Sequence, residues 1–422
     1  MNPGMTVLLS LLLSTGMTLA AFCQSTETKS IAIEEIDRNF QQATVGGRDV
    51  AYKDALQAPC VLSGFPWRDP AKPLYRLPAA FTDQEVNPGA LSLARHTAGG
   101  AIRFRTDSPY IAVRAQLACS SDMNHMPRAG SAGFDLYRGS GAAVEYCKTV
   151  QPGRDQKQIE NLLVTGGTGQ MTDYILYLPL YGSASTIEVG LAPDATLEAP
   201  TPQAISRPVL FYGSSITQGG CASRPGNAYT TMLCRAIDAP QINLGFSGSG
   251  RGEIAIARAI AGLELAAFVM DYDHNAPTPE HLQKTHEPFF QAIRQEQPNL
   301  PVIMMSKCDF RDSRDHGARR AIIRKTYDNA VAAGDRHVWF VDGETLFGTE
   351  DRDACTVDGC HPNDLGFYRM YKTVLPVLNE AVRAGRTPRT RRTSGACPPA
   401  KGADRPGSPS ARAQRRQPRP RA

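Results

Sequence analysis

The chain has 422 residues, and 46 Lys or Arg against 41 Asp or Glu give it a formal net charge of +5. This excess is local, because residues 383–422 hold twelve basic residues and one acidic residue, and the remainder holds 34 basic and 40 acidic residues. The chain is 41% hydrophobic, which excludes collagen-like, wholly disordered and membrane-channel proteins. Its body outside residues 383–422 is mildly acidic and indicates no basic domain for nucleic acid. The length permits two or three domains, each with its own core.

Residues 1–22 have the pattern of a secretory signal peptide. An apolar run, "VLLSLLL" from Val7 to Leu13, precedes the small residues of "STGMTLAA", although no Lys or Arg stands before it. The run is shorter than the ~20 residues of a membrane-spanning helix, and Phe22 stands where a lipoprotein signal requires a small residue. We therefore expect an exported protein, periplasmic or extracellular, without a transmembrane segment.

Residues 25–200 have the pattern of an antiparallel β-sandwich. Short stretches of alternating character are separated by clusters of Gly, Pro, Asp and Ser, as is typical of such folds. These stretches are "AIRFRT", "YIAVRAQL", "GFDLYRG", "YILYLPLY" and "STIEVGL". Pro200 and Pro202 then mark a linker.

Residues 205–383 change to a repeated order of strand, turn and helix. The predicted strands are "PVLFY" ending at Tyr212, "QINLG" at Gly245, "LAAFVMDY" at Tyr272, "PVIMMS" at Ser306 and "HVWFVD" at Asp342. The predicted helices are Asn227–Ile237, Glu253–Leu263, His286–Gln295, Asp315–Ala333 and Asn363–Arg383. This alternation predicts a five-stranded parallel sheet with helices on both faces. Functional groups of such folds gather beyond the carboxyl ends of the strands.

The C-terminal residues 384–422 are rich in Arg, Pro and Ala and show no apolar periodicity. This composition predicts a disordered basic tail. Contact with an anionic polymer is one role for it, but a solvated, dispensable tail is the more common outcome. Truncation after Arg383 is therefore expected to leave the activity in place.

The cysteines leave two interpretations open. Apart from Cys23 and Cys397, eight cysteines remain, an even number that an exported protein could pair as disulfides. Buried free thiols are equally compatible with this low density. A zinc site is not indicated, because no C-x-x-C is present and Cys355 and Cys360 are five apart.

Two segments of the second half carry a nucleophile and a base. In "FYGSSITQGG", Ser215 begins a loop after a predicted strand, where an exposed serine can be a nucleophile, although a serine there is more often a turn or cap residue. In "DGCHPNDLGF", Asp358 and His361 are three residues apart, so the carboxylate can orient an imidazole that deprotonates the serine. Their joint occurrence after strands of one sheet predicts a Ser-His-Asp arrangement.

Two further segments offer donors for an oxyanion. In "NLGFSGSG", the glycines permit close backbone approach, so the N–H of Gly248 can point at a developing negative charge; the alternative is a flexible turn. In "VMDYDHNAP", the amide of Asn275 can serve the same oxyanion, and the alternative is a structural asparagine. A phosphate-binding loop is excluded, because neither G-x-G-x-x-G nor a G-K-[ST] ending is present.

These four segments, in this order, resemble the four sequence blocks of the SGNH, or GDSL-like, hydrolase superfamily. The resemblance implies a flavodoxin-like three-layer α/β domain in which Ser215 is the nucleophile and Asp358 and His361 complete the triad. It further implies an oxyanion hole formed by the Ser215 N–H, the Gly248 N–H and the Asn275 amide, with no metal or organic cofactor. The α/β-hydrolase family is excluded because Ser249 replaces the last glycine of G-x-S-x-G.

The sequence departs from the usual blocks at two places. Ser214 stands where "GDS" has Asp, and "DYDHN" replaces the usual "GxND". Both changes resemble a two-domain subgroup in which "GFDLY" and "LYLPLY" belong to a preceding jelly-roll-like sandwich of the GxDLY type. Members of that subgroup resemble exported carbohydrate esterases, which implies acetyl esters on glycans as substrates.

Two other functions remain open at this point. One is a glycan-binding protein with a vestigial hydrolase domain, for which Trp67, Tyr110, Tyr137 and Tyr174 are the candidate stacking residues. The other is an acyltransferase that uses the same acyl-enzyme with a different acceptor.

Overall fold

The computed structural model describes residues 41–141, 143–308 and 315–386. Residues 41–385 belong to one compact unit. The predicted signal peptide and the basic tail lie outside the described residues, apart from the end of the last helix.

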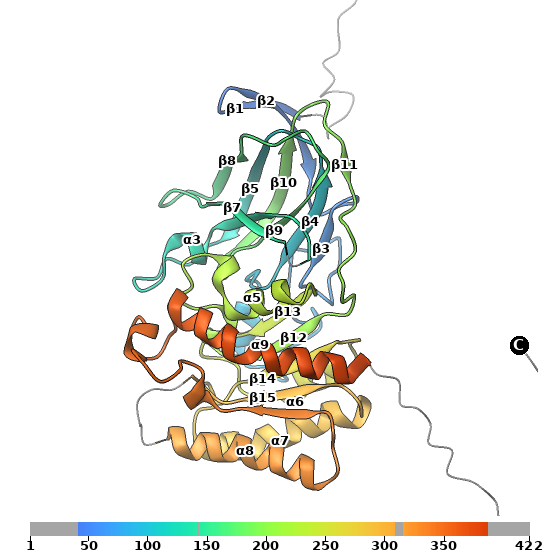
Figure 1. The fold of residues 1–422 in the computed structure, drawn as a ribbon. Helices are drawn as coiled ribbons and strands as arrows, with labels where there is room; N and C mark the ends of the chain where they lie inside the picture. The colour runs from blue at the N-terminus through green and yellow to red at the C-terminus, as the bar shows by residue number, and fades with distance from the viewer. Residues whose placement is uncertain (1–40, 142, 309–314, 387–422) are drawn as a thin grey trace, which may run out of the picture. The chain divides into compact units, whose positions relative to one another are not determined.

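The first half of the chain is an antiparallel sandwich (Figure 1). One sheet has the order β1 (Gln41–Val45), β2 (Arg48–Asp54), β10 (Ser183–Leu191), β5 (Ile111–Cys119) and β8 (Gln158–Val164). The other has the order β11 (Leu197–Glu198), β4 (Ala101–Thr106), β9 (Thr172–Tyr177), β6 (Phe134–Arg138) and β7 (Glu145–Val150), with β3 (Val61–Ser63) beside β4. The two inner faces bury a shared apolar core that includes Phe104, Val113 and Leu136.

The second half is built on a parallel sheet. Its order is β13 (Gln241–Gly245), β12 (Val209–Gly213), β14 (Ala267–Asp271), β15 (Val302–Met305) and β16 (Val338–Val341). Numbered along the chain, this order is 2-1-3-4-5, the flavodoxin-like arrangement in which ligands bind where the strand order reverses. The predicted fold class is confirmed.

Successive residues of each strand face opposite layers. Val209 and Phe211 of β12 pack towards α5 (Tyr229–Ala236) and α9 (Asp364–Arg386). Leu210 and Tyr212 pack towards the other layer of helices, α6 (Ile254–Ala261), α7 (Pro279–Glu296) and α8 (His316–Ala332) (Figure 1). Burial on both faces explains why these strands are almost continuously apolar.

The predicted helices occur close to their expected ranges, with one clear difference. Helix α7 begins at Pro279 rather than at His286. Thr278 caps its N-terminus by accepting a hydrogen bond of 3.2 Å from the His281 N–H, and Pro279 has the fixed φ that suits the first helical turn. The pair Thr278-Pro279 was the sequence signal for this start.

Part of the first half packs into the core of the second. The segment between β3 and β4 contains helix α2 (Pro88–Leu93). Its residues Leu77, Val86, Ala90 and Ala94 are buried in the same cluster as Tyr212 and Phe246. Besides the core inside the sandwich, the two halves of the sequence therefore share a buried apolar cluster, which the strand pattern alone did not indicate.

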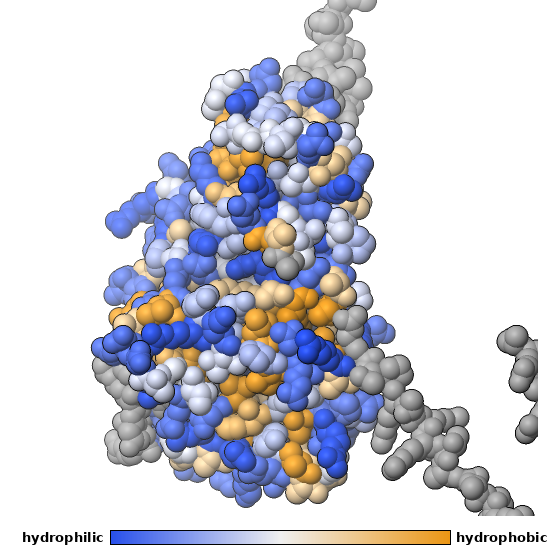
Figure 2. Space-filling view, viewed as in Figure 1, coloured by the Kyte–Doolittle hydropathy of each residue, from blue (hydrophilic) through white to orange (hydrophobic). Residues whose placement is uncertain are grey.

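The surface and the thiols complete the description. Figure 2 shows a mostly hydrophilic face over the sandwich and more hydrophobic residues around α9, where Leu365 is exposed and Leu375 is partly buried. No helix among the described residues is long and apolar enough to span a bilayer. All eight cysteines outside Cys23 and Cys397 are free thiols, so the structure agrees with the free-thiol interpretation rather than with disulfides.

Candidate active site

The structure brings three predicted residues into direct contact. Ser215 Oγ lies 2.9 Å from His361 Nε2, and His361 Nδ1 lies 2.7 Å from Asp358 Oδ2. Ser215 is buried, whereas the side chains of His361 and Asp358 are 24% and 37% exposed. The serine hydroxyl thus faces an imidazole whose second nitrogen is held by a carboxylate, on a side that solvent reaches.

The loop that carries Asp358 and His361 fixes their geometry. Asp358 Oδ1 accepts hydrogen bonds from the N–H groups of Cys360 (2.9 Å) and His361 (2.7 Å). Partial burial would raise the pKa of Asp358, but these N–H groups and the His361 ring lower it to about 2. The loop is closed by a β-bridge between Thr356 and Pro362. Asp358 therefore remains a carboxylate that can stabilise a protonated imidazole.

Ser215 begins the short helix α4 (Ser215–Gln218), and Ser214 is its N-cap. The Ser214 Oγ accepts a hydrogen bond from the Ile216 N–H, and the Thr217 Oγ1 accepts one from the Ser214 N–H, each at 3.1 Å. This capping box explains why a serine is tolerated at position 214, where the family usually has Asp: its hydroxyl caps the N-terminus of α4. It also orders the backbone that presents the Ser215 hydroxyl.

Gly248 and Asn275 follow the two strands that flank β12. Gly213, the last residue of β12, is in register with Gly245 of β13 and with Asp271 of β14. Ser215, Gly248 and Asn275 stand two, three and four residues after these positions, so all three belong to one edge of the sheet. Among the described residues no hydrogen bond joins Ser215 to either of the other two.

The local backbone explains the glycines of the segment after β13. Gly248 has φ +67°, which only glycine adopts readily, and a Cβ there would meet nothing within 4 Å. At Gly245 a Cβ would lie 2.2 Å from the Gln218 N, so this glycine permits the close approach of α4. Gln218 Oε1 in turn accepts a hydrogen bond of 3.0 Å from the Ser247 N–H, which ties this loop to the helix that carries Ser215.

The loop of Asn275 is fixed from the neighbouring helix. Arg319 of α8 donates hydrogen bonds to the carbonyls of Asp273 (2.6 Å) and Ala276 (2.9 Å). Asn275 is half-buried, and its Oδ1 is buried with no hydrogen-bond partner among the described residues. The unpartnered atom is an acceptor oxygen, so a ligand that satisfies it in this orientation must donate a hydrogen bond, whereas an oxyanion would need the N–H groups of the same amide.

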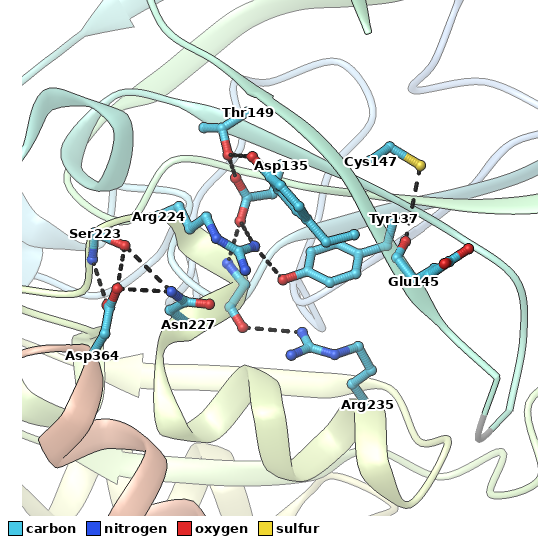
Figure 3. Close-up of polar contacts among 12 residues, drawn as sticks. Asp135, Tyr137, Glu145, Cys147, Thr149, Ser223, Arg224, Asn227, Arg235 and Asp364 are labelled. Carbon is cyan, nitrogen blue, oxygen red and sulfur yellow. Dashed lines mark hydrogen bonds and ion pairs between the residues drawn. The ribbon is translucent and has the colours of Figure 1, made fainter. Parts of the chain in front are cut away.

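The "GFDLY" motif of the sandwich contacts the loop that follows α4 (Figure 3). Asp135 is fully buried and accepts hydrogen bonds from the Gly226 N–H (2.8 Å), from Arg224 Nη1 (3.1 Å) and from the Thr149 hydroxyl. The Tyr137 hydroxyl also accepts a hydrogen bond from Arg224. Burial raises the pKa of Asp135, and these donors oppose the shift.

The same loop reaches the segment of His361 (Figure 3). Asp364 directly follows the "HPN" of the histidine loop and begins α9. It accepts hydrogen bonds from the Ser223 N–H and from Asn227 Nδ2, both at 2.9 Å, and from the Ser223 hydroxyl. Asp364 binds Ser223 and Asn227, and Asp135 binds Arg224 and Gly226, which lie between them. Both carboxylates therefore hold the same short loop, which connects the sandwich to the segment of the catalytic histidine candidate.

Further residues near the site were not anticipated from the sequence. Tyr181, of the "LYLPLY" motif, donates a 3.3 Å hydrogen bond to the Ser215 carbonyl. Arg76 is fully buried, its guanidinium lies 4.8 Å from the Phe246 ring centroid, and burial lowers its pKa to about 9. Four backbone carbonyls accept its hydrogen bonds: Leu93, His96, Asn243 and Gly245. No sequence signal marks Arg76, because an arginine usually lies at the surface even when its neighbours along the chain, here Tyr75 and Leu77, are apolar or aromatic.

His125 is a second unanticipated neighbour. It lies in the sandwich loop between β5 and helix α3 (Arg128–Ser131). The centroids of the His125 and His361 rings are 5.8 Å apart. A loop of the first half therefore forms part of the surroundings of the triad candidate.

Two family models match the chain. Residues 206–379 match the GDSL-like lipase/acylhydrolase family, and residues 50–197 match the GxDLY N-terminus of SGNH-hydrolase-type esterases. The second half of the chain belongs to the GDSL-like lipase/acylhydrolase family. With the matching sandwich, the protein is an ester hydrolase of the SGNH type. The resemblance read from its sequence blocks is confirmed.

Solved structures of similar proteins extend over both halves of this SGNH hydrolase. A putative GDSL-like lipase from Bacteroides ovatus is 28% identical, with a TM-score of 0.71 over 79% of this chain and 98% of that chain. The salicylyl-acyltransferase SsfX3 of a tetracycline biosynthetic pathway is 21% identical, with a TM-score of 0.64 over 77% and 95%. An acetyl xylan esterase from Butyrivibrio proteoclasticus is 13% identical, with a TM-score of 0.52 over 79% and 99%. A search among curated proteins found no match.

Proposed function

We propose that this SGNH hydrolase is a serine esterase that removes acyl groups, with acetyl as the preferred one, from carbohydrates. The observation that carries the proposal is the chain of contacts from Ser215 Oγ through both ring nitrogens of His361 to Asp358. Such an arrangement activates a hydroxyl without a metal or an organic cofactor.

The proposed mechanism proceeds through an acyl-enzyme. His361 takes the proton of Ser215 through Nε2, while Oγ attacks the ester carbonyl and Asp358 stabilises the imidazolium that forms. The N–H groups of Ser215 and Gly248 and the amide of Asn275 are the proposed donors to the oxyanion. His361 then gives the proton to the leaving alcohol, and water, activated by the same imidazole, releases the acid.

A carbohydrate carrier is supported by the exposure of the site. The imidazole and the carboxylate are partly exposed, so a bulky, hydrophilic acyl carrier can approach them. The chain also shares its fold with family two carbohydrate esterases. One of them, from Clostridium thermocellum, is 13% identical with a TM-score of 0.53. This shared fold supports a carbohydrate substrate for our proposal. The acyltransferase alternative keeps the same residues and differs only in the acceptor.

The four aromatic residues proposed to stack on sugars in the glycan-binding alternative pack into the protein. Tyr110, Tyr137 and Tyr174 are at most 9% exposed, and Trp67 packs against the core of the second half. These aromatic rings stabilise the fold rather than offer a stacking surface. The ordered contacts of Ser215, His361 and Asp358 also argue against a vestigial site.

The test is covalent labelling combined with kinetics. A fluorophosphonate probe should label the wild-type protein at Ser215, and Ser215→Ala should lose both the label and the hydrolysis of aryl acetates. Ser185→Ala, which changes an exposed serine on β10 that contacts none of these residues, is the matched control and should keep the label. Full activity of Ser215→Ala would refute the proposal.

The acceptor and the substrate need separate measurements. Acetate release from acetylated xylan, mannan, pectin and sialylated glycans would identify the carrier. An acyltransferase would instead transfer the acyl group to added sugar in preference to water. We further propose export of the protein, on the basis of residues 1–22, and N-terminal sequencing of the mature protein tests this.

A further inference from the structure

Three side chains that bind metal ions in proteins meet beside Ser215. His125, Cys221 and His361 come from three separate segments, and one ligand atom of each lies within 4.8 Å of those of the others. His125 is exposed, His361 is half-buried, and Cys221 is 4% exposed. Two imidazole nitrogens and one thiolate are donors that suit Zn²⁺ and related transition metals.

Both imidazoles have the second contact that metal-binding histidines usually make. His125 Nδ1 lies 3.0 Å from the side-chain oxygen of Asn124, and His361 Nδ1 lies 2.7 Å from the Asp358 carboxylate. Such acceptors fix the ring orientation and the tautomer, with the proton on Nδ1 and a lone pair on Nε2. The Nε2 atoms are therefore the natural ligand atoms.

The backbone around Cys221 is strained and firmly packed. Cys221 has φ +79°, a left-handed conformation that a non-glycine residue adopts only when its surroundings impose it. At Gly130, just after the His125 loop, a Cβ would lie 2.1 Å from the Ala222 carbonyl oxygen. Met126 is buried in the same cluster as Cys221. The loop of His125 and the backbone of Cys221 are thus held against each other.

We propose that His125, Cys221 and His361 form an inhibitory binding site for Zn²⁺. Tetrahedral coordination needs ligand atoms about 3.5 Å apart, and the exposed side chain of His125 supplies most of the small approach required. The fourth position is left to water. On binding, the Cys221 thiol releases its proton to solvent, and no electron is transferred.

Inhibition follows from the shared nitrogen. Nε2 of His361 contacts the Ser215 hydroxyl, so the lone pair that would accept the serine proton is the one that the ion would use. This step rests on the proposed function, in which His361 is the base. The binding of the ion does not rest on it, and the two are therefore measured separately.

Binding is tested with Co²⁺ as a spectroscopic substitute for Zn²⁺ in the full-length protein. A thiolate-to-cobalt charge-transfer absorption should appear in the wild-type protein and in Ser215→Ala. It should be absent from Cys221→Ser and present in Cys147→Ser, the matched control on β7. Loss of the absorption in Cys360→Ser together with its retention in Cys221→Ser would overturn the proposal, because Cys360 would then be the ligand.

Inhibition is tested with Zn²⁺ on aryl acetate hydrolysis, with reversal by a chelator. The Zn²⁺ concentration that halves the activity should rise at least about tenfold in His125→Ala and in Cys221→Ser, each compared with its own activity without metal. Unchanged sensitivity of both variants would overturn the proposal. Because His125 is exposed, His125→Ala should fold normally, and thermal unfolding checks this. Activity of Ser215→Ala would refute the proposed function. The cobalt spectra would still show, independently of that result, whether the metal ion binds at His125, Cys221 and His361.

Discussion

Asp135 offers the sharpest test of how the sandwich supports the catalytic half. Its buried carboxylate accepts hydrogen bonds from Gly226, Arg224 and Thr149, and Figure 3 labels the last two. In Asp135→Ala the Gly226 N–H, which is buried, loses its acceptor, and Arg224 loses its carboxylate partner. Both losses fall on the loop between α4 and α5, which contacts Asp364.

The expected magnitude follows from the burial of each partner. Removing one member of a buried ion pair typically costs about 3–5 kcal/mol, because the other charge is left unpaired. The side chain of Arg224 is 23% exposed, so water compensates part of this loss. We therefore expect Asp135→Ala to lower the free energy of unfolding by about 3 kcal/mol, and Asp135→Asn, which keeps an acceptor oxygen, by about 1–2 kcal/mol.

Urea denaturation measures the stability, and steady-state kinetics on the folded fraction measures the site. A shift of the loop moves Asp364 and the histidine segment, so kcat of folded Asp135→Ala should fall as well. Glu145→Gln is the matched control, because Glu145 forms an exposed ion pair with Arg138 on the adjoining strands and should change neither quantity. Wild-type stability and wild-type kcat in Asp135→Ala would refute the role assigned to this carboxylate.

Three further predictions address the site itself. Asn275→Ala should lower kcat about 10²–10³-fold while the urea midpoint stays unchanged, because it removes a donor to the oxyanion rather than a core contact. Asp358→Asn should lower kcat about 10³–10⁴-fold with little change of KM, since the ring of His361 would lose its anionic partner. Burial raises the pKa of Asp271 to about 8, and the nearby Asp273 adds to this shift. Between about pH 4 and pH 8, the folded protein therefore keeps a proton on Asp271 that the unfolded chain releases. The free energy of unfolding should therefore fall as pH rises through this window, by at most about 1.4 kcal/mol per pH unit, and Asp271→Asn should flatten this dependence in urea titrations at several pH values.

The sequence predicted the structure best where a local pattern alone determines the secondary structure. Apolar runs followed by turn residues identified the strands of the parallel sheet, because strands covered on both faces must be apolar throughout. Once the strand ends were known, the edge of the sheet that carries Ser215 followed from the parallel order. Ser215 closely follows β12, whereas two short 3-10 helices separate His361 from β16. The contact of His361 with Ser215, across 146 positions of the chain, was therefore indicated by the resemblance to the family's sequence blocks rather than by a strand end.

The contacts between the two halves were not predictable in this way. Arg76 is buried only because four carbonyls of distant segments converge on it, and nothing in its neighbourhood along the sequence signals that convergence. His125 lies in an unremarkable polar loop, and its proximity to His361 depends on how α3 packs against Ala222. Such placements depend on tertiary packing, and local patterns carry no information about it.

Contacts from the sandwich, together with the replacement of Asp by Ser214, order the backbone around Ser215. Ser214 replaces an Asp and takes over the N-cap of α4, while Tyr181 of the sandwich contacts the Ser215 carbonyl and Asp135 holds the loop that follows. Both sandwich residues belong to the motifs "GFDLY" and "LYLPLY". We infer that these motifs order the backbone that follows Ser215. On this view the sandwich and the parallel sheet form one catalytic unit, and residues 205–383 alone would lack contacts on which the geometry of Ser215 depends.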